Sequence, residues 1–214
     1  MGKELASLVL KTVLLTLLSI VGVAAVFFFL LSLTAPAAMA KLTLDLGMYK
    51  QSAWFAYLQY ADGNGDISYI EDAFNRCVYI EYDKGIIEYG TMYIEDERFE
   101  EYAAEREEEE AELGYLEVYT QYVYGVISVS YYNTEENETA LELALSVNQD
   151  SFDEYNAVTD LITEVMLARD TEYAADIRDA LETLQTAGTV KSSDEQGYLE
   201  TAISKLELFI EIYG

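Results

Sequence analysis

Among the side chains of this sequence that can do chemistry, carboxylates are the most numerous. The chain of 214 residues holds 40 Asp and Glu, no His and a single Cys. Without His it lacks an imidazole general base, a Ser-His or Cys-His nucleophile pair and His-ligated zinc, and one Cys cannot form an intramolecular disulfide or a thiolate metal cage. Paired carboxylates hydrolyse glycosides in other proteins, but the acids are too abundant to single out a pair. A secreted acidic hydrolase is therefore an alternative that requires a cleft with a raised carboxyl pKa.

The most specific local pattern spans residues 60–71, Tyr-Ala-Asp-Gly-Asn-Gly-Asp-Ile-Ser-Tyr-Ile-Glu. As a twelve-residue loop it resembles the EF-hand calcium loop. The resemblance implies calcium ligands, with the last residue as the bidentate closing one, at Asp62, Asn64, Asp66, Ser68 and Glu71. Tyr60 replaces the leading Asp of the family, which removes one charged ligand, and no second such loop follows. The alternative is a Gly- and Asn-rich turn between two helices.

Tyrosine is in excess, with 19 residues in the chain. Tyr115, Tyr119 and Tyr122 recur at helical spacing together with Val126, which places them on one helix face. One interpretation is a core seam. The other is a groove that binds a partner, since Tyr offers a large amphipathic contact area at low entropic cost, and these three tyrosines are then the candidate contact residues.

The net charge of −28 bears on the class of partner. Nucleic-acid affinity depends on Lys and Arg that neutralise phosphates, so we expect no DNA or RNA partner. A strongly negative surface favours cationic partners or divalent cations. The densest acidic run, residues 105–112, is typical of a solvated helix face, with a docking strip for a basic partner as the alternative.

An uncharged stretch at residues 12–33 predicts a membrane segment. Its 22 residues are long enough to cross a hydrocarbon core of about 30 Å. Lys3 and Lys11 precede it, so the positive-inside tendency places residues 1–11 in the cytoplasm and the following chain outside. We therefore expect a single-pass protein of the cell membrane with an extracytoplasmic domain.

A cleaved signal peptide is the competing interpretation of this stretch. Residues 38–40, Ala-Met-Ala, resemble a signal-peptidase site, and cleavage there would release a secreted protein. The apolar run is longer than the roughly 7–15 residues of a secretory h-region, which favours an uncleaved anchor. We assign residues 34–41 to a linker and residues 42–214 to one exported domain.

Apolar residues recur every three to four positions through the exported part, which predicts helices joined by short loops. The alternative of a strand applies only to residues 122–132, which are rich in Val, Ile and Tyr. Consecutive helices with short connections pack as antiparallel hairpins. We expect helices at 42–61, 67–80, 83–95, 97–112, 115–131, 135–148, 154–169, 171–187 and 194–212.

A weak internal repeat accompanies these helices. Tyr49 is followed by the small residue Ser52, and Tyr82 is followed at the same distance by the small residue Gly85. A small residue one turn into a helix lets it approach the preceding helix closely. In these two residue pairs, and in the distance along the chain from the first pair to the second, the sequence resembles the tetratricopeptide repeat family. The unit of that family is a two-helix hairpin of about 34 residues. It departs from that family in lacking a Trp near the helix start and a closing Pro, and later echoes do not fall on one period.

The resemblance implies a curved surface that binds partners and performs no catalysis. The expected fold class is all-α, a transmembrane helix followed by stacked antiparallel hairpins in a solenoid similar to tetratricopeptide repeats. The expected function is a membrane-anchored, extracytoplasmic scaffold for protein–protein interaction, without a resident cofactor. A calcium-dependent binding module at residues 60–71 and the acidic hydrolase are the two alternatives.

Overall fold

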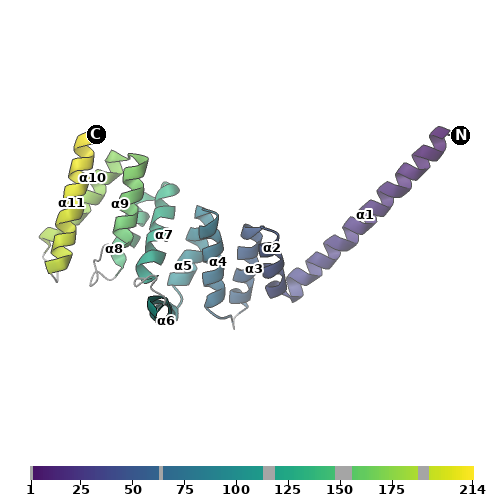
Figure 1. The fold of residues 1–214 in the computed structure, drawn as a ribbon, viewed down its shortest axis with the longest axis horizontal. Coiled ribbons are helices and arrows are strands. Elements are labelled where there is room, and N and C mark those ends of the chain that lie inside the picture. The colour runs from purple at the N-terminus through teal and green to yellow at the C-terminus, as the bar shows by residue number, and fades with distance from the viewer. Residues whose placement is uncertain (1, 63–64, 113–118, 148–155, 188–192) are drawn as a thin grey trace.

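The computed structural model describes residues 2–62, 65–112, 119–147, 156–187 and 193–214. Over these residues the chain is all-α, as predicted, and a long N-terminal helix precedes a row of packed helices (Figure 1). In chain order the helices are α1 Gly2–Thr34, α2 Pro36–Asp45, α3 Tyr49–Ala61, α4 Ser68–Tyr79, α5 Asp83–Ile94, α6 Phe99–Glu112, α7 Tyr119–Asn133, α8 Asn137–Ser146, α9 Ala157–Ala168, α10 Thr171–Thr186 and α11 Ser193–Tyr213.

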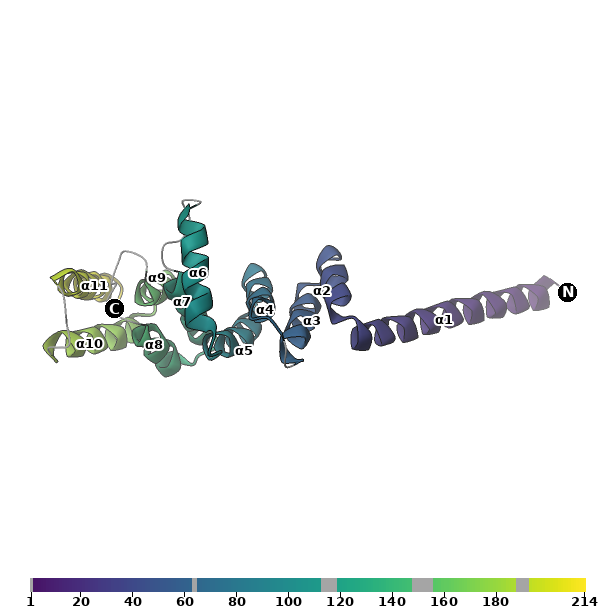
Figure 2. The ribbon, with the colours of Figure 1, turned by 90° about the horizontal axis from the view of Figure 1, so that it is seen from below.

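The row consists of stacked helical hairpins. The described hairpins are α2–α3, α4–α5, α7–α8 and α9–α10, each packing on the next, and α11 packs on α10 at the C-terminal end. Figure 2 shows α5, α8 and α10 along one side of the stack and α9 and α11 along the other. Each element therefore contacts its neighbours in the row, which is the arrangement of a helical-repeat protein.

All of these hairpins turn in the same way. A residue with positive φ follows the first helix in each case, at Gly47, Glu81, Glu135 and Arg169. Its N–H donates to the carbonyl three positions back, and the next N–H donates to the carbonyl five positions back, as in Glu81 to Val78 and Tyr82 to Cys77, both at 3.0 Å. This is the Schellman motif, which satisfies carbonyls that the helix end leaves unpaired.

The spacing of these turns reveals a repeat period. The interval from Gly47 to Glu81 equals the interval from Glu135 to Arg169. The interval between Glu81 and Glu135 is longer by more than half a period. It accommodates α6, which lies across the stack in Figure 2 and packs on α7. The inserted helix explains why the first of the later sequence echoes misses a single period.

The two small residues of the repeat have the predicted steric role. Ser52 is buried in α3 and its Oγ donates to the Ala40 carbonyl of α2 at 2.6 Å. A Cβ on Gly85 of α5 would collide with Cys77 Sγ of α4 at 2.6 Å. Both residues thus let the second helix of a hairpin pack closely on the first. Cys77 itself is fully buried.

Three details of the predicted elements need correction or resolution. The single helix expected at 42–61 is two helices, α2 and α3, because Gly47 adopts φ +71° and ends the first. The linker expected at 34–41 is mostly helical, because Pro36 occupies the first turn of α2, where its missing N–H costs nothing. Residues 122–132, for which a strand was the alternative, belong to α7.

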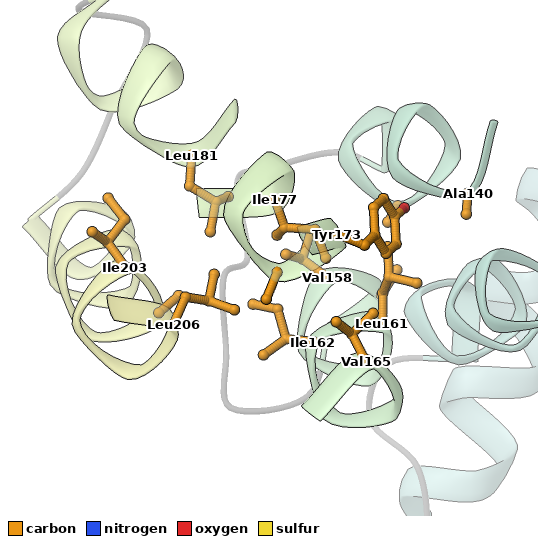
Figure 3. Packing of buried hydrophobic residues seen from close by; sticks show 14 of the residues in the cluster. Ala140, Val158, Leu161, Ile162, Val165, Tyr173, Ile177, Leu181, Ile203 and Leu206 are labelled. Carbon is orange, nitrogen blue, oxygen red and sulfur yellow. The ribbon is translucent and has the colours of Figure 1, made fainter. Parts of the chain in front are cut away.

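Two apolar cores run through the stack. The first joins α3, α4, α5, α6 and α7, and its largest fully buried residues include Phe74 and Tyr93. The second joins α8 to α11, where Figure 3 shows Leu161 and Val165 of α9 facing Tyr173 and Ile177 of α10. Continuous burial between hairpins keeps the stack together, since each buried aliphatic side chain contributes about 1.5–3 kcal/mol.

Helix α1 projects from the stack with its apolar side chains exposed (Figure 1). Its segment Val9–Thr34 is 26 residues long and apolar enough to cross a membrane. At its C-terminal end Leu31 packs against the small cluster of Met39, Ala40 and Phe55 from α2 and α3. The end of the candidate span is therefore part of the same apolar cluster as the first hairpin.

Candidate functional site

A groove crosses the middle of the stack. Its volume is about 680 Å³, and it is lined by the α4–α5 turn, the start of α5, one face of α7 and the face of α9 beside it. The insertion of α6 comes between α5 and α7 in the chain, but both of these helices contribute to the groove and pack on each other. Side chains from three different hairpins therefore meet there.

The groove combines apolar walls with an acidic rim. Val78, Ile86 and Val126 supply apolar surface, and Tyr122 adds an aromatic ring that is half-buried. Among the residues that the structure describes, the lining includes no Lys or Arg and four carboxylates: Glu81, Asp83, Asp160 and Glu164. Such a surface repels anions and attracts a cationic group, with apolar area available for the stem of a long side chain.

Close approach of α7 and α9 places Asp160 in the groove. Its Oδ2 occupies the space that a Cβ at position 125 would need, so Gly125 is required for this packing. The side chain keeps contact with solvent at the groove surface, but desolvation beside α7 raises the pKa of its carboxyl above the usual value. Asp83, on the opposite wall, accepts a hydrogen bond from Asn133 Nδ2 at 3.3 Å. Asp160 is thus the groove carboxylate with the most perturbed surroundings.

A second polar cluster lies inside the stack, around Glu71 of α4. This carboxylate is 6% exposed and accepts hydrogen bonds from the hydroxyls of Tyr102 and Tyr119, each at 2.6 Å. Arg106 Nε lies 3.2 Å from the same group. Tyr93 and Tyr119 also share a hydroxyl contact of 3.3 Å. The cluster connects α4, α6 and α7, and burial raises the pKa of the Tyr93, Tyr102 and Tyr119 hydroxyls.

The segment at residues 60–71 is held by the connection between α5 and α6. Tyr60 donates its hydroxyl hydrogen to Asp96 at 2.8 Å, and Arg98 donates to the Gly65 carbonyl at 3.0 Å. Arg98 also contacts both oxygens of Asp96, which holds the pKa of that carboxyl well below its usual range. A guanidinium therefore lies against the turn for which a calcium site was predicted.

The predicted calcium ligands have these positions. Glu71 faces inward to the tyrosines, Asp66 Oδ1 accepts from the Ser68 backbone N–H at 3.0 Å, and Asp62 is exposed after α3. Asn64 lies outside the described residues. The described part of the chain contains no group of three or more His, Cys, Asp or Glu able to hold a metal. Calcium binding stays a prediction.

Two of the three predicted tyrosines, Tyr119 and Tyr122, have different surroundings in the structure. Tyr119 is 3% exposed and belongs to the Glu71 cluster, whereas Tyr122 lines the groove. Their rings are 6.3 Å apart at the centroids, so α7 presents one inward and one toward the groove. Tyr115 lies outside the described residues.

The four groove carboxylates were not singled out from the sequence. They come from the α4–α5 turn, α5 and α9, and spacing along the chain gives no reason to group them among 40 acids. The repeat becomes visible only from the positive-φ turns of the structure, one of which is Glu81.

Comparisons of the chain with protein-family models, with curated proteins and with solved structures found no match.

Proposed function

We propose that the protein is a membrane-anchored scaffold that binds a basic segment of a partner protein in the groove between α4–α5, α7 and α9. The observation that carries this proposal is the lining of the groove, whose described residues provide four carboxylates, apolar walls and no cation. A Lys or Arg side chain can place its apolar stem on Val78 and Val126 and its charge beside Asp160 or Glu81.

The repeat architecture supports binding as the activity. Turns of one geometry recur at an interval that matches the unit of about 34 residues of tetratricopeptide repeats. Solenoids of this kind offer an extended surface made by several repeats, and the groove is made by three hairpins. We propose that the chain is a divergent repeat protein of the tetratricopeptide type with one inserted helix.

Anchoring would bring the scaffold and its membrane partners together. Helix α1 is the candidate span, and Lys3 and Lys11 favour a cytoplasmic N-terminus. The extracytoplasmic domain would then meet partners of the same membrane at a raised effective concentration.

The proposal is tested by neutralising the groove. Binding of Lys- and Arg-containing peptides is measured by fluorescence anisotropy on the full chain in nanodiscs. Asp160→Asn with Glu164→Gln should weaken binding at least tenfold, because two lost charge-assisted hydrogen bonds cost about 1.5–3 kcal/mol each. The matched control is Glu138→Gln with Glu142→Gln, which removes the same charge from the exposed face of α8 and should leave affinity unchanged. Equal losses in both variants would reject the groove as the site.

A carboxylate-dependent hydrolase is the second candidate. It is favoured by the placement of two carboxylates, Asp160 and Glu164, one turn apart on α9 in the groove. Desolvation raises the pKa of the Asp160 carboxyl, in the direction that a general acid needs. Turnover of chromogenic glycosides by the parent protein, lost in Asp160→Asn, would support the hydrolase over the scaffold.

A further inference from the structure

The first hairpin, α2–α3, differs from the rest of the stack in its exposed residues. Leu46 and Met48 in its turn and Trp54 on α3 are 63%, 41% and 46% exposed. The end of a helical-repeat stack usually has a polar outer face, because no further repeat covers it. These three side chains therefore leave apolar surface at the end of the stack that adjoins α1 (Figure 1).

Charge also separates this hairpin from the remaining chain. Residues 35–61 carry two Lys and one Asp, whereas residues 62–214 carry eight Lys and Arg against 38 Asp and Glu. An anionic surface is repelled by the negatively charged lipids of many membranes, and Lys is attracted to them. Lys41 is exposed, and Lys50 is exposed with its ammonium over the Tyr82 ring, 3.6 Å from the centroid. The net positive charge of this hairpin makes it the part of the domain that suits a lipid headgroup layer.

The connection to α1 holds the hairpin close to the end of the candidate span. Only Ala35 separates α1 from α2, and its N–H donates to the Leu31 carbonyl at 2.8 Å while its own carbonyl accepts from Met39. Leu31 packs on Met39, Ala40 and Phe55, and the ring of Phe55 lies beside that of Trp54 with a centroid distance of 4.9 Å. Buried apolar contacts through Phe55 thus link the end of the span to Trp54.

From these observations we propose that the α2–α3 hairpin rests in the lipid headgroup layer, with Trp54, Leu46 and Met48 as its contact residues. The occupant of this surface is the bilayer that α1 crosses, so the inference rests on the anchoring proposed above. Trp is enriched at the membrane–water interface because its ring is apolar and its N–H is polar, and lysine side chains reach the headgroups from nearby positions. The rest of the stack would then point away from the bilayer.

The chain has a single Trp, which makes this placement measurable. The full chain is reconstituted in phosphatidylcholine nanodiscs whose acyl chains carry bromine either near the headgroup or near the bilayer centre. Trp54 should lose most of its fluorescence with shallow bromines and little with deep ones. In the matched control, Trp54→Phe with Tyr213→Trp, the reporter is on α11 with a similar exposure, 53%, and should not be quenched.

Flotation of the same sample separates failure of the inference from failure of anchoring. If the chain floats with the lipid but Trp54 is quenched no more than the α11 reporter, the hairpin does not touch the bilayer and the inference is wrong. Protection of Trp54 from aqueous acrylamide without lipid quenching would likewise overturn it, because a protein would then cover the surface. If the chain does not float, the proposed membrane anchoring is wrong, and the proposed contact of the hairpin with lipid is then wrong as well.

Discussion

At the scale of single residues, Glu71 illustrates how one side chain admits two interpretations. Its position at the end of the 60–71 pattern predicts a calcium ligand, whereas the fold directs both carboxylate oxygens to Tyr102 and Tyr119. Buried carboxylates are retained when hydrogen bonds and a cation compensate for lost hydration, and Arg106 is the neighbouring cation. The structure therefore gives Glu71 a role in joining helices.

Replacing Glu71 tests that role. Glu71→Gln should lower the free energy of unfolding by about 1–3 kcal/mol, because charged acceptors are lost from two buried hydroxyls, and urea titration measures the loss. Glu95→Gln, on an exposed residue, is the control and should have little effect. The loss should be the same in millimolar calcium and in chelator. A rise in melting temperature that calcium causes in the parent and Glu71→Gln abolishes would instead support the EF-hand interpretation.

Buried tyrosines predict a loss of stability at alkaline pH. Burial raises the pKa of Tyr89 to about 12, and the pKa of Tyr93 and Tyr119 is also raised. A phenol in the unfolded chain ionises near pH 10, so the folded state holds these protons more tightly. The contribution of these tyrosines to the free energy of unfolding is complete below about pH 10, and it falls as the pH rises toward the pKa of the folded state.

Urea midpoints between about pH 9 and about pH 11 measure this effect. The midpoint should stay constant to about pH 10 and fall from there to about pH 11. Tyr89→Phe removes one titrating group, so its stability should depend less steeply on pH than that of the parent. A midpoint that stays constant to pH 11 in the parent would contradict the burial of these hydroxyls.

At the scale of elements, the repeated turn carries strain that glycine would relieve. Glu135 has φ +67°, a conformation that costs an L-residue with a Cβ roughly 1 kcal/mol. Glu135→Gly should therefore stabilise the protein by up to about 1 kcal/mol. Glu138→Gly, in the first turn of α8, should destabilise it by about 0.5–1 kcal/mol. Thermal unfolding checks both, and a loss of stability in Glu135→Gly would show that the turn does not adopt this conformation.

Much of the helical organisation followed from the sequence, because apolar periodicity marks elements such as 67–80 and 83–95 close to the observed bounds of α4 and α5. The split between α2 and α3 was missed because the apolar pattern continues through Gly47, and only its positive φ ends the helix. The period was obscured because the insertion of α6 lengthens one interval between turns and because Glu and Arg replace Gly at the later turns.

The groove was less predictable than the helices. Helical spacing predicted Tyr122 as a groove residue, but the same spacing also selected Tyr119. The Tyr119 hydroxyl donates a hydrogen bond to Glu71 in the core. Asp160 has its place because Gly125 leaves room across the α7–α9 contact, and that contact joins residues far apart in the chain. Periodicity describes one helix at a time, so it does not specify which faces of different hairpins meet.

At the scale of the whole molecule, the position of the candidate cleavage pattern within α2 bears on whether α1 is retained. The sequence pattern for cleavage, residues 38–40, lies inside α2, where Met39 and Ala40 are buried. The Ala40 carbonyl accepts the hydrogen bond from Ser52. Cleavage after Ala40 would remove half of α2 and uncover Phe55. We therefore propose that the anchor is retained.

Intact mass and N-terminal sequencing of the protein from its native membrane check the retained anchor. A chain that still includes α1 is expected. A mature N-terminus at Lys41 would contradict the proposal and replace it with secretion.

We propose the acidic groove as the binding surface of the protein, and site-specific photo-crosslinking in the native membrane tests this proposal. The crosslinker replaces Tyr122 in the groove, or Leu208, which is 57% exposed on α11, as the control. We predict that the groove position captures a defined protein through a Lys- or Arg-bearing segment, and that Asp160→Asn with Glu164→Gln abolishes this capture. Capture that is equal at both positions, or unaffected by neutralising the carboxylates, would contradict the claim.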